Sequence, residues 1–200
     1  MLKALTNISR GISITAILLF SALSLNGETL AIDKGHSEVG FSIKHLMISS
    51  VKGKFTQYDG DIKYDLKSKS FTKFDTYVET KSIDTGITKR DNHLRSADFF
   101  EAKKYPKLTF KMDSYENDGD EGVLIGNLTI HGVTKRVKLE VENNGSIKDL
   151  RGNTRIGFTI TGKINRKDFG LTWNKALEAG GVVVGDKVKI IIELQTIVVK

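Results

Sequence analysis

The sequence contains no cysteine and a single proline among its 200 residues. Without cysteine the chain forms no disulfide, binds no metal through thiolate and carries no cysteine nucleophile. A lipid anchor attached through cysteine is excluded for the same reason. A domain of this composition must therefore be held together by its own hydrophobic core.

A hydrophobic run long enough to cross a bilayer comfortably is also lacking, because the longest apolar run extends only from Gly11 to Leu25. Lys3 and Arg10 precede this run, no acidic residue interrupts it, and the small residue Gly27 follows it. This order is typical of a secretory signal peptide. We expect residues 1–27 to be removed near Gly27 and residues 28–200 to form one exported domain, periplasmic or secreted. An uncleaved membrane anchor is the alternative.

Several catalytic signatures are missing from the sequence. It contains no G-x-S-x-G elbow, no phosphate-binding P-loop and no dinucleotide-binding glycine pattern. The four histidines, His36, His45, His93 and His131, show no H-x-x-x-H spacing. We therefore expect neither an enzyme nor a protein that requires a metal or another cofactor.

The excess of positive charge is small. Two of the seven net positive charges belong to Lys3 and Arg10, which leaves +5 for the expected mature domain. The remaining lysines are scattered singly, which favours a solvated outer face over a nucleic-acid interface. We expect no nucleic-acid partner.

What the sequence does contain is strand after strand with period-2 alternation, the signature of half-buried β-strands. Asp59-Gly60 is a strong two-residue turn signal, and it predicts a hairpin between the strand starting at Val51 and the strand after it. Between eight and ten antiparallel strands are expected. Clear alternation covers residues 39–45, 74–82, 108–112, 123–130, 156–164 and 188–194.

One stretch, Ser82–Pro106, interrupts the alternation with charges, aromatics and a histidine. Thr88 followed by Asp91 predicts the start of a helix, and Ser96 repeats the signal one turn later. Pro106 ends any helix before alternation resumes. A β framework with one such insert predicts a barrel whose open end is covered by a short helical lid.

Six segments of the sequence together match the pattern of a known family. They are IDKGHSEVGFSIKHL (residues 32–46), GKFTQYDGDI (53–62), SIDTG (82–86), RDNHLRSADFFEAKKYPKLTF (90–110), GNLTIHGVTKRV (126–137) and INRKDFGL (164–171). With these segments the chain resembles the YceI-like family of exported lipid-binding proteins, and the resemblance covers Ile32–Leu194. It implies an all-β fold, an extended antiparallel lipocalin-like β-barrel of about eight strands with a short helical insert, which binds polyisoprenoid chains or other long amphiphiles. Asn92 and Ile87 depart from the family pattern.

Candidate ligand contacts are the apolar and aromatic residues of the inward strand faces and of the irregular segments, because such residues hold an aliphatic chain without polar specificity. These candidates are Phe41, Ile43, His45, Phe55, His93, Phe99, Phe100, Phe110, Phe158, Phe169 and Trp173. Candidate head-group contacts are His36, Asp91, Arg95 and Arg166. Asp91 and Arg95 are also spaced to form an ion pair along a helix, which would make them structural.

These features predict an exported binding or carrier protein for a long-chain amphiphile, such as a polyisoprenoid, an isoprenoid-quinone-like lipid or a fatty lipid. One alternative is a lipid-modifying enzyme, an isomerase or hydrolase using His93 or His45 as a base. Another is a stress-associated interaction protein with a filled core. A transient contact with a membrane surface and a homodimer are compatible with these readings.

Overall fold

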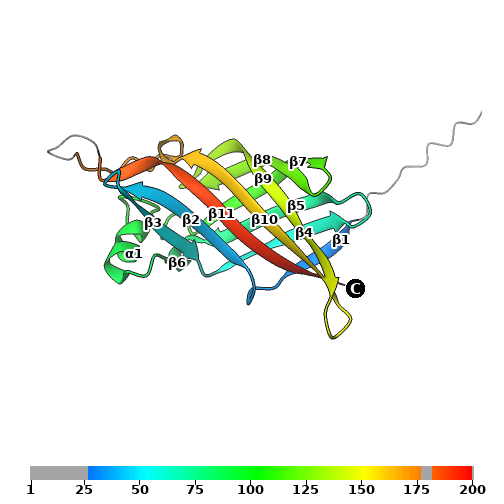
Figure 1. Cartoon of the computed structure of the whole chain (residues 1–200). Coiled ribbons are helices and arrows are strands. Elements are labelled where there is room, and N and C mark those ends of the chain that lie inside the picture. Colours follow the sequence, from blue (N-terminus) through cyan, green and yellow to red (C-terminus); the bar gives the residue numbers. More distant parts are fainter. Residues whose placement is uncertain (1–26, 177–181, 200) are drawn as a thin grey trace, which may run out of the picture.

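The computed structural model describes residues 27–176 and 182–199, and the leader prediction for the first residues lies outside this part of the chain apart from Gly27. The described residues form one antiparallel sheet of eleven strands, eight of which close into a ring because β11 pairs back onto β1 (Figure 1). In spatial order the ring contains β1 (Glu28–Ile32), β4 (Tyr58–Asp65), β5 (Ser70–Glu79), β7 (Lys107–Asp118), β8 (Glu121–Ile130), β9 (Val133–Lys148), β10 (Thr154–Asn165) and β11 (Val184–Val198).

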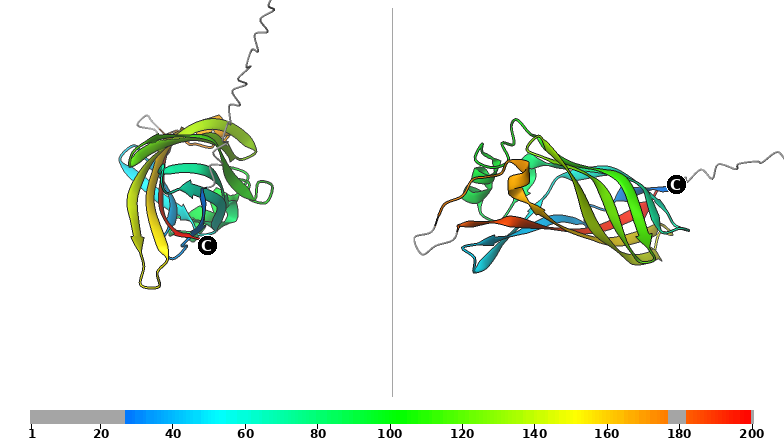
Figure 2. Two further views of the ribbon diagram at one scale, coloured as in Figure 1. Left: turned by 90° about the vertical axis from the view of Figure 1, so that its right-hand side faces the viewer. Right: turned by 90° about the horizontal axis from the view of Figure 1, so that it is seen from above.

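Three further strands extend the barrel wall at one end of the ring. They are β2 (Glu38–His45), β3 (Ser49–Phe55) and β6 (Ile83–Asp84). The long strand β11 pairs with β1 through residues 196–198 and with β2 through residues 184–193. Its two halves therefore belong to a closed barrel at one end and to an extended wall at the other (Figure 2). The predicted extended antiparallel barrel of about eight strands is confirmed.

The insert contains one α-helix, α1 (Thr88–Arg95), preceded by a 3₁₀ turn, η1 (Thr80–Ser82), and by β6. The helix begins at the predicted residue, but the Thr88 side chain does not cap it. The predicted second helix start at Ser96 is wrong, because the Ser96 carbonyl accepts the N–H groups of Phe99 and Glu101 in successive turns. Within the described residues, no helix has the length and apolar character needed to span a bilayer.

The predicted turn at Asp59-Gly60 is also wrong, because both residues lie inside β4. Strand β4 does not pair with β3; it pairs with β1 and β5. Gly60 is needed for close approach of two strands, since a Cβ there would lie 2.6 Å from the Thr76 methyl group and 2.7 Å from the Asp75 carbonyl oxygen.

The end of the barrel where β11 meets β1 is filled by aromatic side chains. The rings of Tyr64, Phe71 and Phe158 lie 4.8–5.1 Å apart in edge-on and tilted pairs, the geometry that aromatic rings prefer. The Tyr64 hydroxyl accepts a hydrogen bond from the Asn143 amide at 2.9 Å, and burial raises the pKa of Tyr64 to about 12. This half of the barrel interior is therefore filled by side chains, whereas the half next to β2 and β3 is hollow.

Candidate functional site

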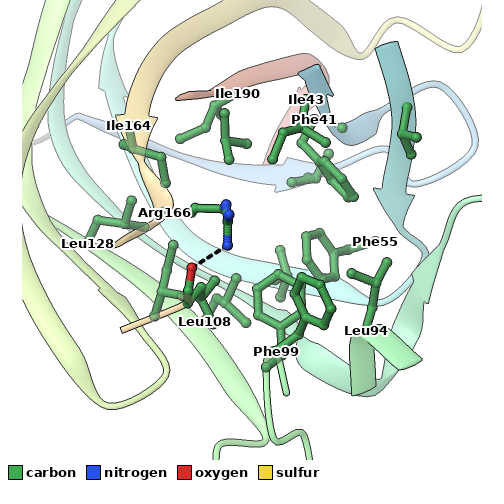
Figure 3. Close-up of a pocket in the computed structure, with 18 of the residues that line it drawn as sticks. Phe41, Ile43, Phe55, Leu94, Phe99, Leu108, Leu128, Ile164, Arg166 and Ile190 are labelled. Carbon is green, nitrogen blue, oxygen red and sulfur yellow. Dashed lines mark hydrogen bonds between the residues drawn. The ribbon is translucent and has the colours of Figure 1, made fainter. Parts of the chain in front are cut away.

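The hollow half of the barrel contains a cavity of about 640 Å³ lined mainly by apolar side chains (Figure 3). Alternation along β2 and β11 creates one wall, because Phe41 pairs directly with Ile190, and Ile43 pairs with Val188. Phe110 contributes from the facing strand β7. The volume falls within the range of pockets that enclose a small-molecule or lipid ligand.

An aromatic cluster from separate parts of the chain forms the wall beside α1. The Phe99 ring lies 5.0 Å from the His93 ring and 5.1 Å from the Trp173 ring. His93 and Trp173 lie edge-on at 4.9 Å. Phe100 meets Phe55 of β3 edge-on at 6.2 Å. All five residues line the cavity, so the insert supplies part of the wall.

The two histidines that line the cavity have different surroundings. The His93 Nε2 atom lies 2.8 Å from the Asp98 carboxylate, which fixes the orientation of the ring. His45 ends β2, opposite Ser49 of β3 and Val184 of β11. Among the described residues there is no group of three or more histidine, aspartate or glutamate side chains placed to hold a metal ion.

Arg166 reaches the cavity from the 3₁₀ turn η2 (Arg166–Phe169), and its side chain is only 3% exposed (Figure 3). Its Nε donates to the Gly185 carbonyl at 2.9 Å, and its Nη1 donates to the carbonyls of Leu171 and Trp173. Burial lowers the pKa of the guanidinium and the Asp186 carboxylate opposes that change, but arginine stays charged at neutral pH. Arg166 therefore ties η2 to β11 and places a positive charge against an apolar space.

Three more cations line the cavity, and the sequence predictions missed them: Lys44, Lys89 and Arg90. Lys44 and Lys89 are exposed, so they lie where the cavity meets solvent. Arg90 is held by hydrogen bonds from its Nε to the Thr85 hydroxyl and from its Nη2 to the Thr85 carbonyl. No described residue that lines the cavity is an aspartate or glutamate, so the opening is electropositive. The sequence signal that could have identified Arg90 was its spacing from Leu94, because residues four apart lie on the same face of a helix.

Nine predicted ligand contacts line the cavity together with the predicted head-group residue Arg166, and the remaining predicted residues lie elsewhere. Phe158 belongs to the filled half, and Phe169 is buried in the core without lining the cavity. His36 lies in the turn after β1, where its Nδ1 is 3.0 Å from Asp33. The residues found at the cavity are Phe41, Ile43, His45, Phe55, His93, Phe99, Phe100, Phe110 and Trp173.

Asp91 and Arg95 do not line the cavity, and each is bound to another part of the insert. The Asp91 carboxylate accepts the Thr85 N–H at 2.9 Å and the Thr85 hydroxyl. Arg95 donates to the main-chain carbonyls of Lys81 at 2.7 Å and Ile83 at 2.6 Å. Both side chains hold α1 against the segment before it, which replaces the ion pair anticipated from their spacing.

The model of the YceI-like domain matches residues 30–196. The chain belongs to the YceI-like family. A Staphylococcus aureus protein of the UPF0312 group is 41% identical over 158 residues, which cover 78% of this chain and 90% of the relative. A crystal structure of the Campylobacter jejuni YceI protein is 41% identical, covers 84% of this chain and 97% of that chain, and superposes with a TM-score of 0.70.

A solved structure with lower sequence identity carries a functional name. A polyisoprenoid-binding domain from Saccharophagus degradans, implicated in plant cell wall breakdown, is 16% identical and superposes with a TM-score of 0.58 over 87% of this chain and 99% of that chain. At this identity the likeness concerns the fold.

Proposed function

We propose that this YceI-like protein binds one long apolar molecule of the polyisoprenoid class in its barrel, as an exported carrier rather than an enzyme. The observation that carries the proposal is the apolar cavity of about 640 Å³ with cations and no carboxylate in its described lining. Each buried methylene contributes about 0.8 kcal/mol, so a chain of isoprene units needs few polar contacts. The name of the Saccharophagus degradans domain supports the same ligand class.

The polar end of the ligand belongs at the electropositive opening. Lys44, Lys89 and Arg90 offer charged hydrogen-bond donors there, and such donors favour an anionic or strongly accepting head group. The proposal includes export, which the basic-then-apolar leader supports. N-terminal sequencing of protein recovered outside the cytoplasm checks this part, with a start near Glu28 expected.

Native mass spectrometry of protein purified without detergent tests ligand binding. The expected result is an adduct that organic solvent extracts as a long-chain lipid. An Ile190→Trp variant should carry less adduct, because Ile190 lines the cavity and the larger ring occupies part of it. Ile191→Trp is the matched control, since Ile191 is the next residue of β11 and does not line the cavity.

A bare mass for the wild type would contradict the proposal and favour the filled-core alternative. Conversion of an added lipid that disappears in a His93→Ala variant would favour the enzyme alternative instead, because His93 lines the cavity beside Asp98. An equal loss of adduct in both tryptophan variants would show that the ligand is held elsewhere.

A further inference from the structure

The turn between β2 and β3 lies at the same end of the molecule as α1 (Figures 1 and 2), and it exposes large apolar side chains. Leu46 is 37% exposed, Met47 63% and Ile48 85%. These three consecutive residues are called the tip here. Isolated exposed apolar residues are ordinary on protein surfaces, but a contiguous group usually marks an interaction site.

The backbone of the tip adopts a conformation that its residues disfavour. Leu46 and Met47 have φ values of 50° and 64°, and the Ile48 N–H donates to the His45 carbonyl at 3.3 Å. Positive φ at both central residues of such a turn is the reason why Asn-Gly dominates there, and bulky residues in this region are strained. Folding alone would favour small residues, so another requirement accounts for Leu46 and Met47.

The tip lies beside the cavity opening. Lys44 and His45, which precede the tip, and Val51, which follows it, line the cavity. Strand β6 runs antiparallel to β3, so the chain that leaves β6 runs toward the tip. It reaches Ile87, which is 52% exposed and also lines the cavity.

The surroundings of the tip are basic. Lys44 and Lys52 flank the tip, and the sequence between them contains no acidic residue. Lys89 and Arg90 add two charges at the start of α1. Two carboxylates on neighbouring described strands already have partners. Asp84 accepts the Gly86 N–H at 2.8 Å, and Asp186 pairs with Lys167 at 2.8 Å.

We infer that the tip, together with Ile87, is a membrane-docking surface that inserts into an anionic lipid bilayer and presents the cavity opening to it. Apolar side chains surrounded by lysine and arginine are the combination that binds an anionic lipid interface. A second protein is a poorer fit, because a three-residue turn cannot provide the roughly 800 Å² per partner of a stable interface. Docking would let an apolar ligand pass from the bilayer into the cavity without crossing water. This role in ligand transfer rests on the proposed function.

Vesicle co-sedimentation tests the surface without any ligand measurement. The wild type should bind vesicles of phosphatidylcholine containing about one-third phosphatidylglycerol, and binding should weaken several-fold when salt is raised from about 0.1 M to about 1 M. A triple variant, Leu46→Asn, Met47→Gly and Ile48→Ser, should bind about tenfold less or weaker still. Its melting temperature should stay equal or rise, because Asn-Gly suits the turn better than Leu-Met.

The matched control is Ile147→Ser with Leu150→Ser. These two residues are 70% and 107% exposed at the hairpin between β9 and β10, and their replacement should leave vesicle binding unchanged. Wild type that stays in the supernatant would overturn the inference, as would a triple variant that sediments like the wild type. Equal loss in the control, or equal binding to pure phosphatidylcholine vesicles, would also overturn it. A native mass spectrum without any adduct, together with intact vesicle binding, would contradict the proposed ligand binding but still support the docking surface.

Discussion

Arg155 joins two turns at the end of the barrel remote from the cavity. Its Nη1 donates to Asp33 after β1, and its Nε donates to Asp149 between β9 and β10 at 2.9 Å. The hydrogen bond from Arg155, reinforced by His36 and Gly35, lowers the pKa of Asp33 to about 2 against the opposing effect of burial. Burial raises the pKa of Asp149, but Arg155 and the Asn153 and Arg151 N–H groups outweigh it and bring the value to about 2.

This cluster makes the free energy of unfolding depend on acid pH. Both folded-state pKa values are about 2, below the ordinary value of 3.8. Between these two pH values the unfolded chain therefore binds more protons than the folded protein. The stabilisation is therefore complete above about pH 5, and it is lost as pH falls through about 2. Arg155→Gln should lower the melting temperature at pH 7 and flatten its decline toward pH 2.

Thermal melts from pH 7 to pH 2 measure this effect. Arg136→Gln is the control, because the Arg136 side chain is 66% exposed and its Nε lies 3.7 Å from Asp113, and exposed pairs contribute little. The same slope in the wild type and in Arg155→Gln would refute the role of the cluster.

Asp91 and Arg90 show that the local sequence predicts the position of a residue on a helix but not the partners of its side chain. The spacing of Asp91 and Arg95 correctly places both on α1, but it does not say that they bond to Thr85 and to main-chain carbonyls. Arg90, adjacent in sequence, reaches the cavity instead. Helical periodicity defines the faces of a helix, whereas the face that meets the cavity depends on contacts with distant segments.

At the scale of elements, the insert is a wall of the cavity. Phe99 and Phe100 both line it, and they pack on different partners, Trp173 and Phe55. Truncating both to alanine should remove about 2–4 kcal/mol of ligand contact, which corresponds to roughly thirtyfold to a thousandfold weaker binding. Most of the change should be faster release, because a wall that closes a cavity governs exit more than encounter.

Stopped-flow dissociation of a fluorescent isoprenoid analogue, read beside the melting temperature, measures this prediction. Phe158→Leu is the control, because Phe158 is 1% exposed in the filled half and does not line the cavity. It should lower the melting temperature and leave the dissociation rate unchanged. An unchanged dissociation rate in the Phe99→Ala, Phe100→Ala double variant would make the insert a scaffold only.

Elements with regular alternation were predictable from the sequence, and their partners were not. Leu108, Phe110 and Met112 face inward and Lys111 faces outward as expected, because alternation is a local property. The Asp59-Gly60 signal failed because glycine in a strand that another strand approaches closely looks, in sequence, like glycine in a turn. The pairing of β1 with β4 and of β3 with β6 joins segments separated by other strands, so no local pattern reports it.

For the whole molecule, closure of the ring depends on a short contact at the end of β11. Only residues 196–198 of β11 pair with β1 in the described structure. Thr196 is fully buried, and its hydroxyl donates to the Ile156 carbonyl at 3.2 Å. Deleting residues 196–200 should therefore cost about 3 kcal/mol or more and expose strand edges that promote aggregation.

Urea unfolding and light scattering measure the effect of this deletion. Removal of residues 199–200 alone is the control, because it removes the hydrogen bond from the Val199 N–H to the Thr29 carbonyl but keeps the three residue pairs. A longer deletion that remains as stable as the control would show that the barrel does not need closure at this seam.

The filled aromatic half closes the cavity at one end, so a bound molecule must enter and leave through the same opening. A guest that enters tail first must back out along the same path, with its head leaving before its tail. Two guests cannot pass through in single file, so the barrel must empty before it can be reloaded. Exchange between lipids would then be limited by unloading, and its rate would not rise with the concentration of the incoming lipid.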